Sequence, residues 1–305
     1  MTVVVRVMED PMSATRHTGA MNEASRWAVE LLSLARPFGD MDVAGALSIA
    51  STLLGSPIHS LAYAREGDKR SHPLRGNSLD ALPDWRGCLS IAGEADNGSS
   101  VYLDLWRLSR SARLPQASGY RSHRFRLEFP ADVLAGRHVE DVLQIVVDMA
   151  AAFGTTYGIM RPLRDGAPAL VARTRGLEEG IPGVWEITVL GGAFRSVVDA
   201  EALRTYPRVA AICSRGHCVG FSLIGDWDEA LPDDAAREIR SLIGNDYFAA
   251  PVHTEARSAD VAAGKFFVGR VRSLFDRIVE DRKARARSSK YRFKHDWSGL
   301  RAGRQ

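Results

Sequence analysis

The segment VEDVLQIVVDMAAAFG, residues 139–154, constrains the fold most, because it carries the clearest helical pattern in the chain. Apolar side chains recur there at the i, i+3, i+4, i+7 spacing of one helix face: Val139, Val142, Leu143, Val146, Ala150 and Phe153. Gly154 follows in the position of a C-terminal cap. A helix with one apolar face needs an apolar surface to cover, and we expect that surface to be a sheet.

Two segments before this helix alternate apolar and polar residues, as half-buried strands do. In VYLDLWRL, residues 101–108, Val101, Leu103 and Leu105 share one face, and RFRLEFP, residues 124–130, alternates in the same way. We predict that these two strands pair and that the 139–154 helix lies across them.

The rest of the chain mixes shorter helical and strand patterns. Helices are predicted over residues 22–37, 42–55, 199–207, 232–244 and 259–287, and strands over 2–7, 156–163, 184–190, 208–213 and 218–224. Residues 65–100 are rich in turn formers and charge, which predicts long loops.

Mixed strands and helices with several hairpins predict the α+β class, an antiparallel or mixed sheet covered by helices, with a long C-terminal helix. We expect one α+β domain over residues 1–255, either undivided or made of two βα halves that meet near 165–180. Residues 256–305 are expected to form a basic helical extension.

Composition limits the class of protein. With 305 residues, 45% of them apolar and 25% charged, the chain is typical of globular proteins. Two acids follow the short apolar run at the N-terminus, where a signal peptide would stay apolar, and no run of eighteen apolar residues occurs. Three cysteines are too few for a disulfide framework. These features predict a cytoplasmic protein with no membrane contact.

The charge is distributed unevenly along the chain. Residues 265–305 hold 13 Lys or Arg and 4 Asp or Glu, a net charge of +9, so that residues 1–264 carry a net charge of −6. Within 282–305, Tyr291, Phe293 and Trp297 stand among the basic residues, a pattern that some single-stranded nucleic-acid binders share. A solvated helix end is the other interpretation of this tail.

The segment CSRGHC, residues 213–218, places two cysteines and a histidine together. A structural zinc site needs four ligands, and a second close pair is missing from the sequence. A redox pair would have two intervening residues rather than four, and a histidine base so near in a turn points away from Cys218. We therefore expect no metal at this segment, and interpret 214–217 as a four-residue hairpin loop whose flanking cysteines, Cys213 and Cys218, face each other in reduced form.

Motifs of several enzyme classes are missing. The sequence contains no phosphate-binding loop, no GxGxxG and no GxSxG. We therefore expect no cofactor, no catalytic residues and a protein that is not an enzyme. An enzyme that uses Cys213 or Cys218 in a deep pocket stays an alternative.

An aromatic residue stands among acids in the segment Gly225, Asp226, Trp227, Asp228 and Glu229, between a predicted strand and a predicted helix. Binding residues concentrate on such loops, and tryptophan is common among residues that dominate interface affinity. The alternative is a core tryptophan flanked by solvated acids. We predict that Asp226, Trp227, Asp228 and Glu229 contact a protein partner.

The order of these motifs resembles the bacterial toxin-immunity proteins called immunity protein fifty-two. The resemblance rests on IPGVWEITVLGGAF, a short helix, and YPRVAAICSRGHCVGFSLIGDWDEALPDDAAREIRSLIG, and it extends over about residues 1–250. The positions that match the family pattern best are Pro182, Gly183, Trp185, Leu190 and Gly216.

The resemblance implies a cytosolic, non-catalytic antidote that binds a cognate toxin of a polymorphic or type VI secretion system. In this family the toxin is often a nuclease of restriction-endonuclease fold. The implied partner is therefore a protein, while nucleic acid bound by the 282–305 tail remains an alternative.

Overall fold

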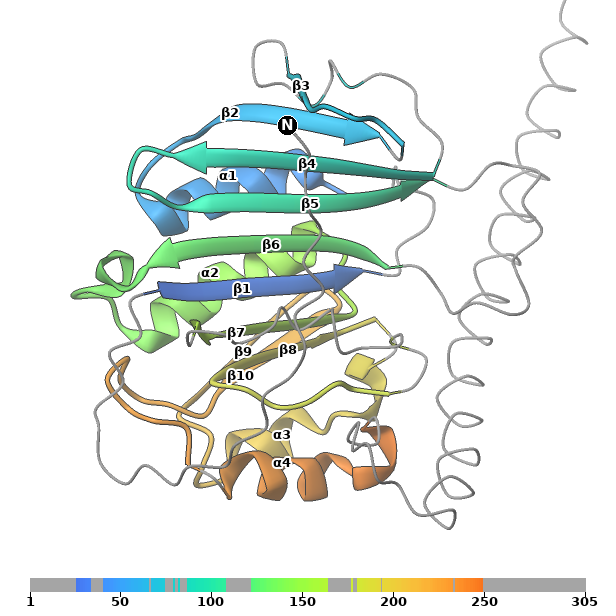
Figure 1. The fold of residues 1–305 in the computed structure, drawn as a ribbon. Helices are drawn as coiled ribbons and strands as arrows, with labels where there is room; N and C mark the ends of the chain where they lie inside the picture. The colour runs from blue at the N-terminus through green and yellow to red at the C-terminus, as the bar shows by residue number, and fades with distance from the viewer. Residues whose placement is uncertain are drawn as a thin grey trace, which may run out of the picture.

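The computed structural model describes residues 26–33, 41–65, 67–74, 79, 82, 87–107, 122–163, 177, 180–192, 194–232 and 234–248 (Figure 1). The predicted strand over 2–7, the predicted helix over 259–287 and the basic extension over 256–305 lie outside these residues.

One ten-stranded sheet runs through the described part of the chain, in the order β3-β2-β4-β5-β6-β1-β7-β8-β10-β9 (Figure 1). All of its strand pairs are antiparallel. The strands are β1 (Arg26–Ser33), β2 (Ile58–Arg65), β3 (His72–Pro73), β4 (Gly87–Ala95), β5 (Ser100–Arg107), β6 (His123–Pro130), β7 (Tyr157–Leu163), β8 (Ile187–Gly191), β9 (Ala211–Arg215) and β10 (Cys218–Ser222).

Four helices accompany this sheet: α1 (Val43–Leu54), α2 (Val139–Ala152), α3 (Ala200–Arg204) and α4 (Ala235–Ile243). The first two pack against each other on one face of the sheet, and α2 crosses β8, β9 and β10. The other two lie near the β8–β10 end (Figure 1). Single-turn helices cover 131–134, 194–197 and 245–247.

The predicted α+β class is wrong, and the predicted long C-terminal helix lies outside the described residues. The structure is mostly sheet, and its longest described helix, α2, has only 14 residues. Individual elements were predicted better: the helices at 42–55 and 139–154 are confirmed as α1 and α2, and the strands at 101–108 and 124–130 pair as β5 and β6.

The predicted helix over residues 22–37 is replaced by β1, the strand at the middle of the sheet. Its sequence RWAVELLS is buried at every position except Arg26, which is half-buried. A strand covered on both faces needs apolar residues on both sides, so it loses the alternation that identifies a half-exposed strand. A short apolar run of this kind cannot be distinguished from a buried helix by periodicity.

The long loops predicted over residues 65–100 were also wrong, because β4 and the end of β2 lie there. In β4, GCLSIAGEA alternates strictly, with Leu89, Ile91, Gly93 and Ala95 buried. Two of its exposed positions carry the small residues Ser90 and Ala92, and the sequence that follows, GEADNGSS, is rich in turn formers. Pairing with β2 and β5 on both sides stabilises this strand.

Two apolar cores lie on opposite faces of the sheet. The larger core joins α1 and α2 to β1, β4, β5 and β6. It includes the edge-to-face contact of Phe125 with Phe153, with 5.6 Å between ring centroids and 65° between ring planes. The smaller core joins β7, β8 and β10 to α3, α4 and the segment around Val184. The β2–β6 part of that second face has no described helix upon it.

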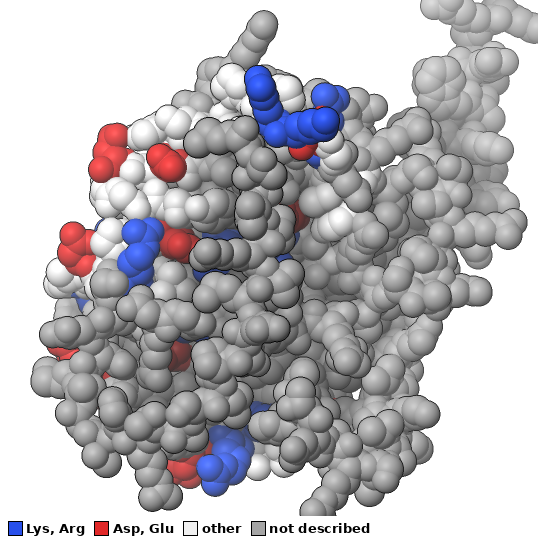
Figure 2. All heavy atoms as spheres, in the orientation of Figure 1, with Lys and Arg blue, Asp and Glu red and all other residues white. Residues whose placement is uncertain are grey.

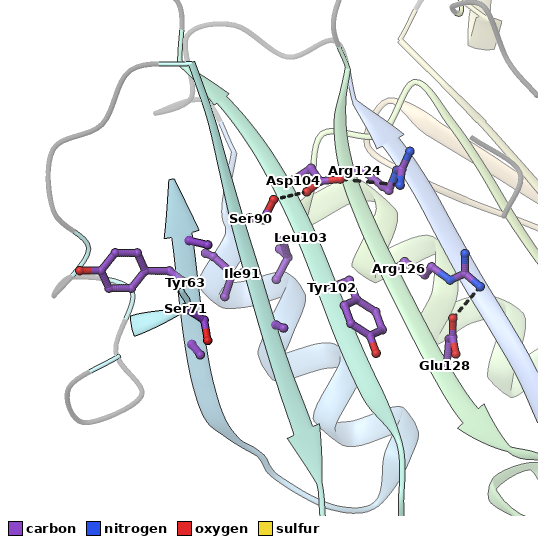
Figure 3. A pocket seen from close by; sticks show the side chains of 13 residues that line it. Tyr63, Ser71, Ser90, Ile91, Tyr102, Leu103, Asp104, Arg124, Arg126 and Glu128 are labelled. Atoms are coloured by element: carbon purple, nitrogen blue, oxygen red, sulfur yellow. Dashed lines mark hydrogen bonds and ion pairs between the residues drawn. The ribbon is translucent and has the colours of Figure 1, made fainter. Parts of the chain in front are cut away.

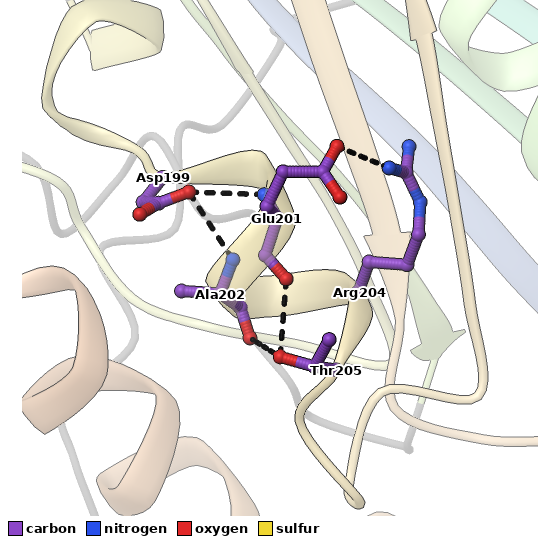
Figure 4. Close-up of polar contacts among 5 residues, drawn as sticks. All are labelled: Asp199, Glu201, Ala202, Arg204 and Thr205. Carbon is purple, nitrogen blue, oxygen red and sulfur yellow. Dashed lines mark hydrogen bonds and ion pairs between the residues drawn. The ribbon is translucent and has the colours of Figure 1, made fainter.

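Side chains at both ends hold the five-residue helix α3 (Figure 4). Asp199 accepts hydrogen bonds from the backbone N–H groups of Glu201 at 3.0 Å and Ala202 at 3.1 Å. At the other end the Thr205 hydroxyl donates to the Glu201 carbonyl at 3.1 Å, and Arg204 pairs with the Glu201 carboxylate. Such caps satisfy the backbone groups that a single turn leaves unpaired.

Gly191, at the end of β8, should not tolerate a side chain. A Cβ atom there would lie 2.1 Å from the Thr155 carbonyl oxygen and 2.9 Å from the Cys218 sulfur. Backbone atoms cannot yield cheaply, so we expect Gly191→Ala to lower the free energy of unfolding by about 3 kcal/mol. Urea unfolding followed by circular dichroism measures this loss. Gly225→Ala is the control, since its Cβ would meet Glu229 at an ordinary 3.6 Å. Equal midpoints for the two variants would contradict the expectation.

Candidate functional site

The loop that follows β10 carries the acidic residues predicted to bind a partner. It begins where the Ser222 hydroxyl donates to the Ile224 carbonyl at 2.8 Å, which turns the buried strand outward. The Glu229 carboxylate accepts hydrogen bonds from the backbone N–H groups of Gly225 at 2.6 Å and Asp226 at 3.3 Å. These bonds close the loop on itself, so that its shape does not depend on a partner.

Trp227 attaches this loop to the body of the protein. Its indole N–H donates to the Arg137 carbonyl at 2.8 Å, and its ring meets Trp27 of β1 edge-to-face at 5.4 Å and 83°. The side chain is half-buried against the larger core. The tryptophan packs on the core and also lines a surface hollow, while its contact with a partner stays a prediction.

That hollow is a cavity of about 290 Å³ between the loop, the residues after β6 and the ends of β1 and β7. Its base is formed by buried apolar residues, Trp27, Leu134 and Pro162, of which Trp27 is only 4% exposed. The acidic loop adds polar surface to the lining. All four predicted partner-binding residues, Asp226, Trp227, Asp228 and Glu229, line it together with Trp27, Ala131, Leu134, Ala135, Gly136 and Pro162. Trp27 comes from a segment that was predicted as helix, so its place here could not be anticipated.

The acids at the mouth of this cavity are exposed: Asp226, Asp228 and Glu229. Across the described residues, no Lys or Arg side chain lies within ion-pair distance of any of them. Arg137 supplies only its carbonyl, while its guanidinium lies beside Gly55. The loop therefore presents negative charge at the opening of a cavity with an apolar base.

A second hollow, a groove of about 510 Å³, lies on the opposite face of the sheet over β2, β4, β5 and β6 (Figure 3). Small residues, Ala62, Ala64 and Ala92, form part of its lining, and Tyr102 beside them is 46% exposed. Charges of both signs occur on this side of the molecule (Figure 2).

The charges along this groove pair with one another. Asp104 accepts a hydrogen bond from the Ser90 hydroxyl at 2.7 Å and pairs with Arg124 at 3.7 Å. Arg126 pairs with Glu128 at 2.5 Å (Figure 3). Since each arginine already has an acidic neighbour, this surface carries little uncompensated charge.

The charged residues along the groove are continued by further charged residues in the interior of the protein, at β1. The Glu30 side chain is fully buried, and its carboxylate lies 3.6 Å from Arg161 and 4.0 Å from Arg126. The Arg161 guanidinium also lies 4.8 Å from the Trp185 ring centroid, a cation–π contact. In the sequence, this network is marked only by Glu30, a glutamate within the apolar run of β1.

The family-pattern residues lie around this interior. Trp185 covers Arg161, and the Gly183 carbonyl accepts a hydrogen bond from the Tyr157 hydroxyl at 3.0 Å. Burial raises the pKa of Tyr157 far above its ordinary value, so the hydroxyl stays protonated and can donate. Leu190 is buried in β8, and Pro182 lies in the segment before it. Of these residues, Leu190 and Trp185 pack in the smaller core on the second face of the sheet.

Gly216 lies in the turn of the β9–β10 hairpin, with a φ of +55° that favours glycine. The hairpin itself differs from the prediction. The strands extend to Arg215 and Cys218, so only residues 216–217 form the turn, and Cys218 pairs with Arg215 while Cys213 pairs with Gly220. The expectation that the two cysteines face each other is wrong, because a tighter turn shifts the register.

Both thiols are free and point to the α2 face. The Cys213 sulfur lies 3.9 Å from the Leu143 carbonyl, and the Cys218 sulfur 3.8 Å from the Thr155 carbonyl. Burial raises the pKa of Cys213 to about 11 and that of Cys218 to about 12, because a thiolate loses its hydration there. These values are opposite to those of a nucleophilic cysteine.

Two further features are missing from the described residues. No group of three or more His, Cys, Asp or Glu side chains there could hold a metal ion. No helix in the same part of the chain is both long and apolar enough to cross a membrane.

Comparisons with known proteins point to a distant structural similarity. No protein-family model matches the sequence, and no curated protein matches it. Among solved structures, the chain is similar to "Pseudomonas aeruginosa T6SS protein PA0821", with a TM-score of 0.49 and 14% sequence identity, over 81% of this chain and 83% of that chain. The resemblance to immunity protein fifty-two therefore remains a prediction.

The buried thiols predict slow alkylation of the native protein. At pH 8 a thiol of pKa about 12 is about a thousandfold less ionised than an ordinary cysteine, and only the thiolate reacts. We expect iodoacetamide to modify Cys218 at least a thousandfold more slowly in the native protein than in urea, with a rate that still rises above pH 9. Peptide mass spectrometry resolves each cysteine. Similar rates in both states would contradict the described burial.

Proposed function

We propose that this protein is a non-catalytic immunity protein, which binds and neutralises a cognate secreted bacterial toxin through the 225–229 loop. The observation that supports this proposal is the arrangement of that loop, where three exposed carboxylates without a described cationic partner surround a cavity with an apolar base. A tryptophan held by Arg137 and Trp27 forms one wall.

This arrangement has the anatomy of a protein interface. Residues that dominate affinity are often tryptophans in well-packed surroundings, with polar groups at the rim. Because the loop is closed by Glu229 and anchored by Trp227, little conformational entropy would be lost on binding. A rigid surface of this kind suits an antidote that must bind tightly.

The charge of the loop indicates the chemistry of the partner. Nucleases bind the phosphate backbone through clusters of Lys and Arg, and a cluster of carboxylates complements such a surface. Opposite charges raise the association rate and disfavour partners of the wrong sign. We include in the proposal that the toxin is a nuclease, with the restriction-endonuclease fold that the sequence resemblance implies.

Charge reversal in the loop tests the proposal. The probe is the toxin encoded in the neighbouring reading frame, co-expressed as an inactive variant and measured by co-purification and by association kinetics. We expect Asp226→Lys with Asp228→Lys to lower the association rate at least tenfold and to abolish protection of cells from the active toxin. The matched control, Glu94→Lys with Glu140→Lys, changes the net charge equally at exposed sites elsewhere.

Two results would overturn the proposal. One is a neighbouring gene product that neither co-purifies with this protein nor is neutralised by it. The other is binding and protection that the loop variant retains in full, with the thermal unfolding midpoint of both variants showing that they are folded.

A further inference from the structure

The cavity beside the 225–229 loop has the shape of a site for one side chain rather than for a flat surface. It encloses about 290 Å³, and its inner wall consists of Trp27, Leu134 and Pro162, which are buried. Trp27 is paired in register with Pro162 across β1 and β7, so two neighbouring strands fix this wall. An occupant must therefore bring an apolar portion into the cavity.

The carboxylates at the opening of the same cavity favour an occupant with positive charge. Asp226, Asp228 and Glu229 line it and are exposed, and the described Lys and Arg side chains all lie beyond ion-pair distance. One oxygen of Glu229 is used by the backbone of the loop, and Asp226 receives only a long hydrogen bond of 3.4 Å from the Asp228 N–H. Carboxylate oxygens therefore remain available at the opening.

An arginine side chain combines both requirements. Its three methylene groups suit an apolar wall, and its planar guanidinium can stack on an indole ring while it donates hydrogen bonds to carboxylates. A lysine offers the same charge but neither the stacking plane nor the paired donors. Resting on the proposed function, we propose that this cavity receives one arginine side chain of the partner protein and so selects the partner.

A free arginine derivative tests this proposal without knowledge of the partner. The probe is N-acetyl-arginine amide, titrated into the full chain while the indole N–H resonance of Trp227 is followed by NMR. We expect a saturable shift, with affinity at least fivefold stronger than that of the uncharged analogue N-acetyl-citrulline amide. Asp226→Asn with Asp228→Asn should weaken the affinity at least fivefold, whereas Glu94→Gln with Glu140→Gln should leave it unchanged.

Several results would overturn the arginine site. These are equal shifts with the arginine and citrulline compounds, no saturable shift with either, or a shift that the loop variant retains. The two proposals can fail separately. If a toxin binds this protein but the cavity does not bind arginine, only the proposed arginine site is overturned. If the cavity binds arginine but the protein neutralises no toxin, the proposed function is overturned.

Discussion

The double burial of β1 is the constraint on which the rest of the structure depends. This strand pairs along its whole length with β6 on one side and with β7 along nearly all of it on the other. It therefore joins the β2–β6 part of the sheet to the β7–β10 part, and its side chains contribute to both apolar cores. Glu30 lies fully buried at its centre, so the arginines of both neighbouring strands must lie close to compensate its charge.

The same strand positions the candidate site. Trp27 stands near the start of β1, where it contacts Trp227 of a loop two hundred residues later in the sequence. Arg137, just before α2, completes the attachment through its carbonyl. The acidic loop is thus fixed to the joint between the halves of the sheet, and its carboxylates are left to solvent. That division separates the residues that hold the site from those that would contact a partner.

The sequence predicted secondary structure correctly at several elements that have one face exposed to solvent and the other face buried. The helix at 139–154 and the strands at 101–108 and 124–130 were predicted because their buried and exposed faces differ, and Trp227 was selected because an aromatic residue among acids is unusual. Periodicity failed at β1, where both faces are buried, and at β4, where small exposed residues resembled a loop. The hairpin at 213–218 was recognised, but its register was not. The same sequence is compatible with a turn of two residues and with a turn of four.

What the sequence determined by itself is the chemistry available: a loop of three acids around a tryptophan, few cysteines, and a charge divided between an acidic body and a basic tail. Tertiary structure decided where that chemistry lies. It brought Trp27 and Pro162 beneath the loop to make a cavity. It also buried the Cys218 thiol fully and the Cys213 thiol partly on the α2 face of the sheet. The physical reason is that burial on two faces and pairing between distant strands are properties of the assembled sheet, which no local pattern records.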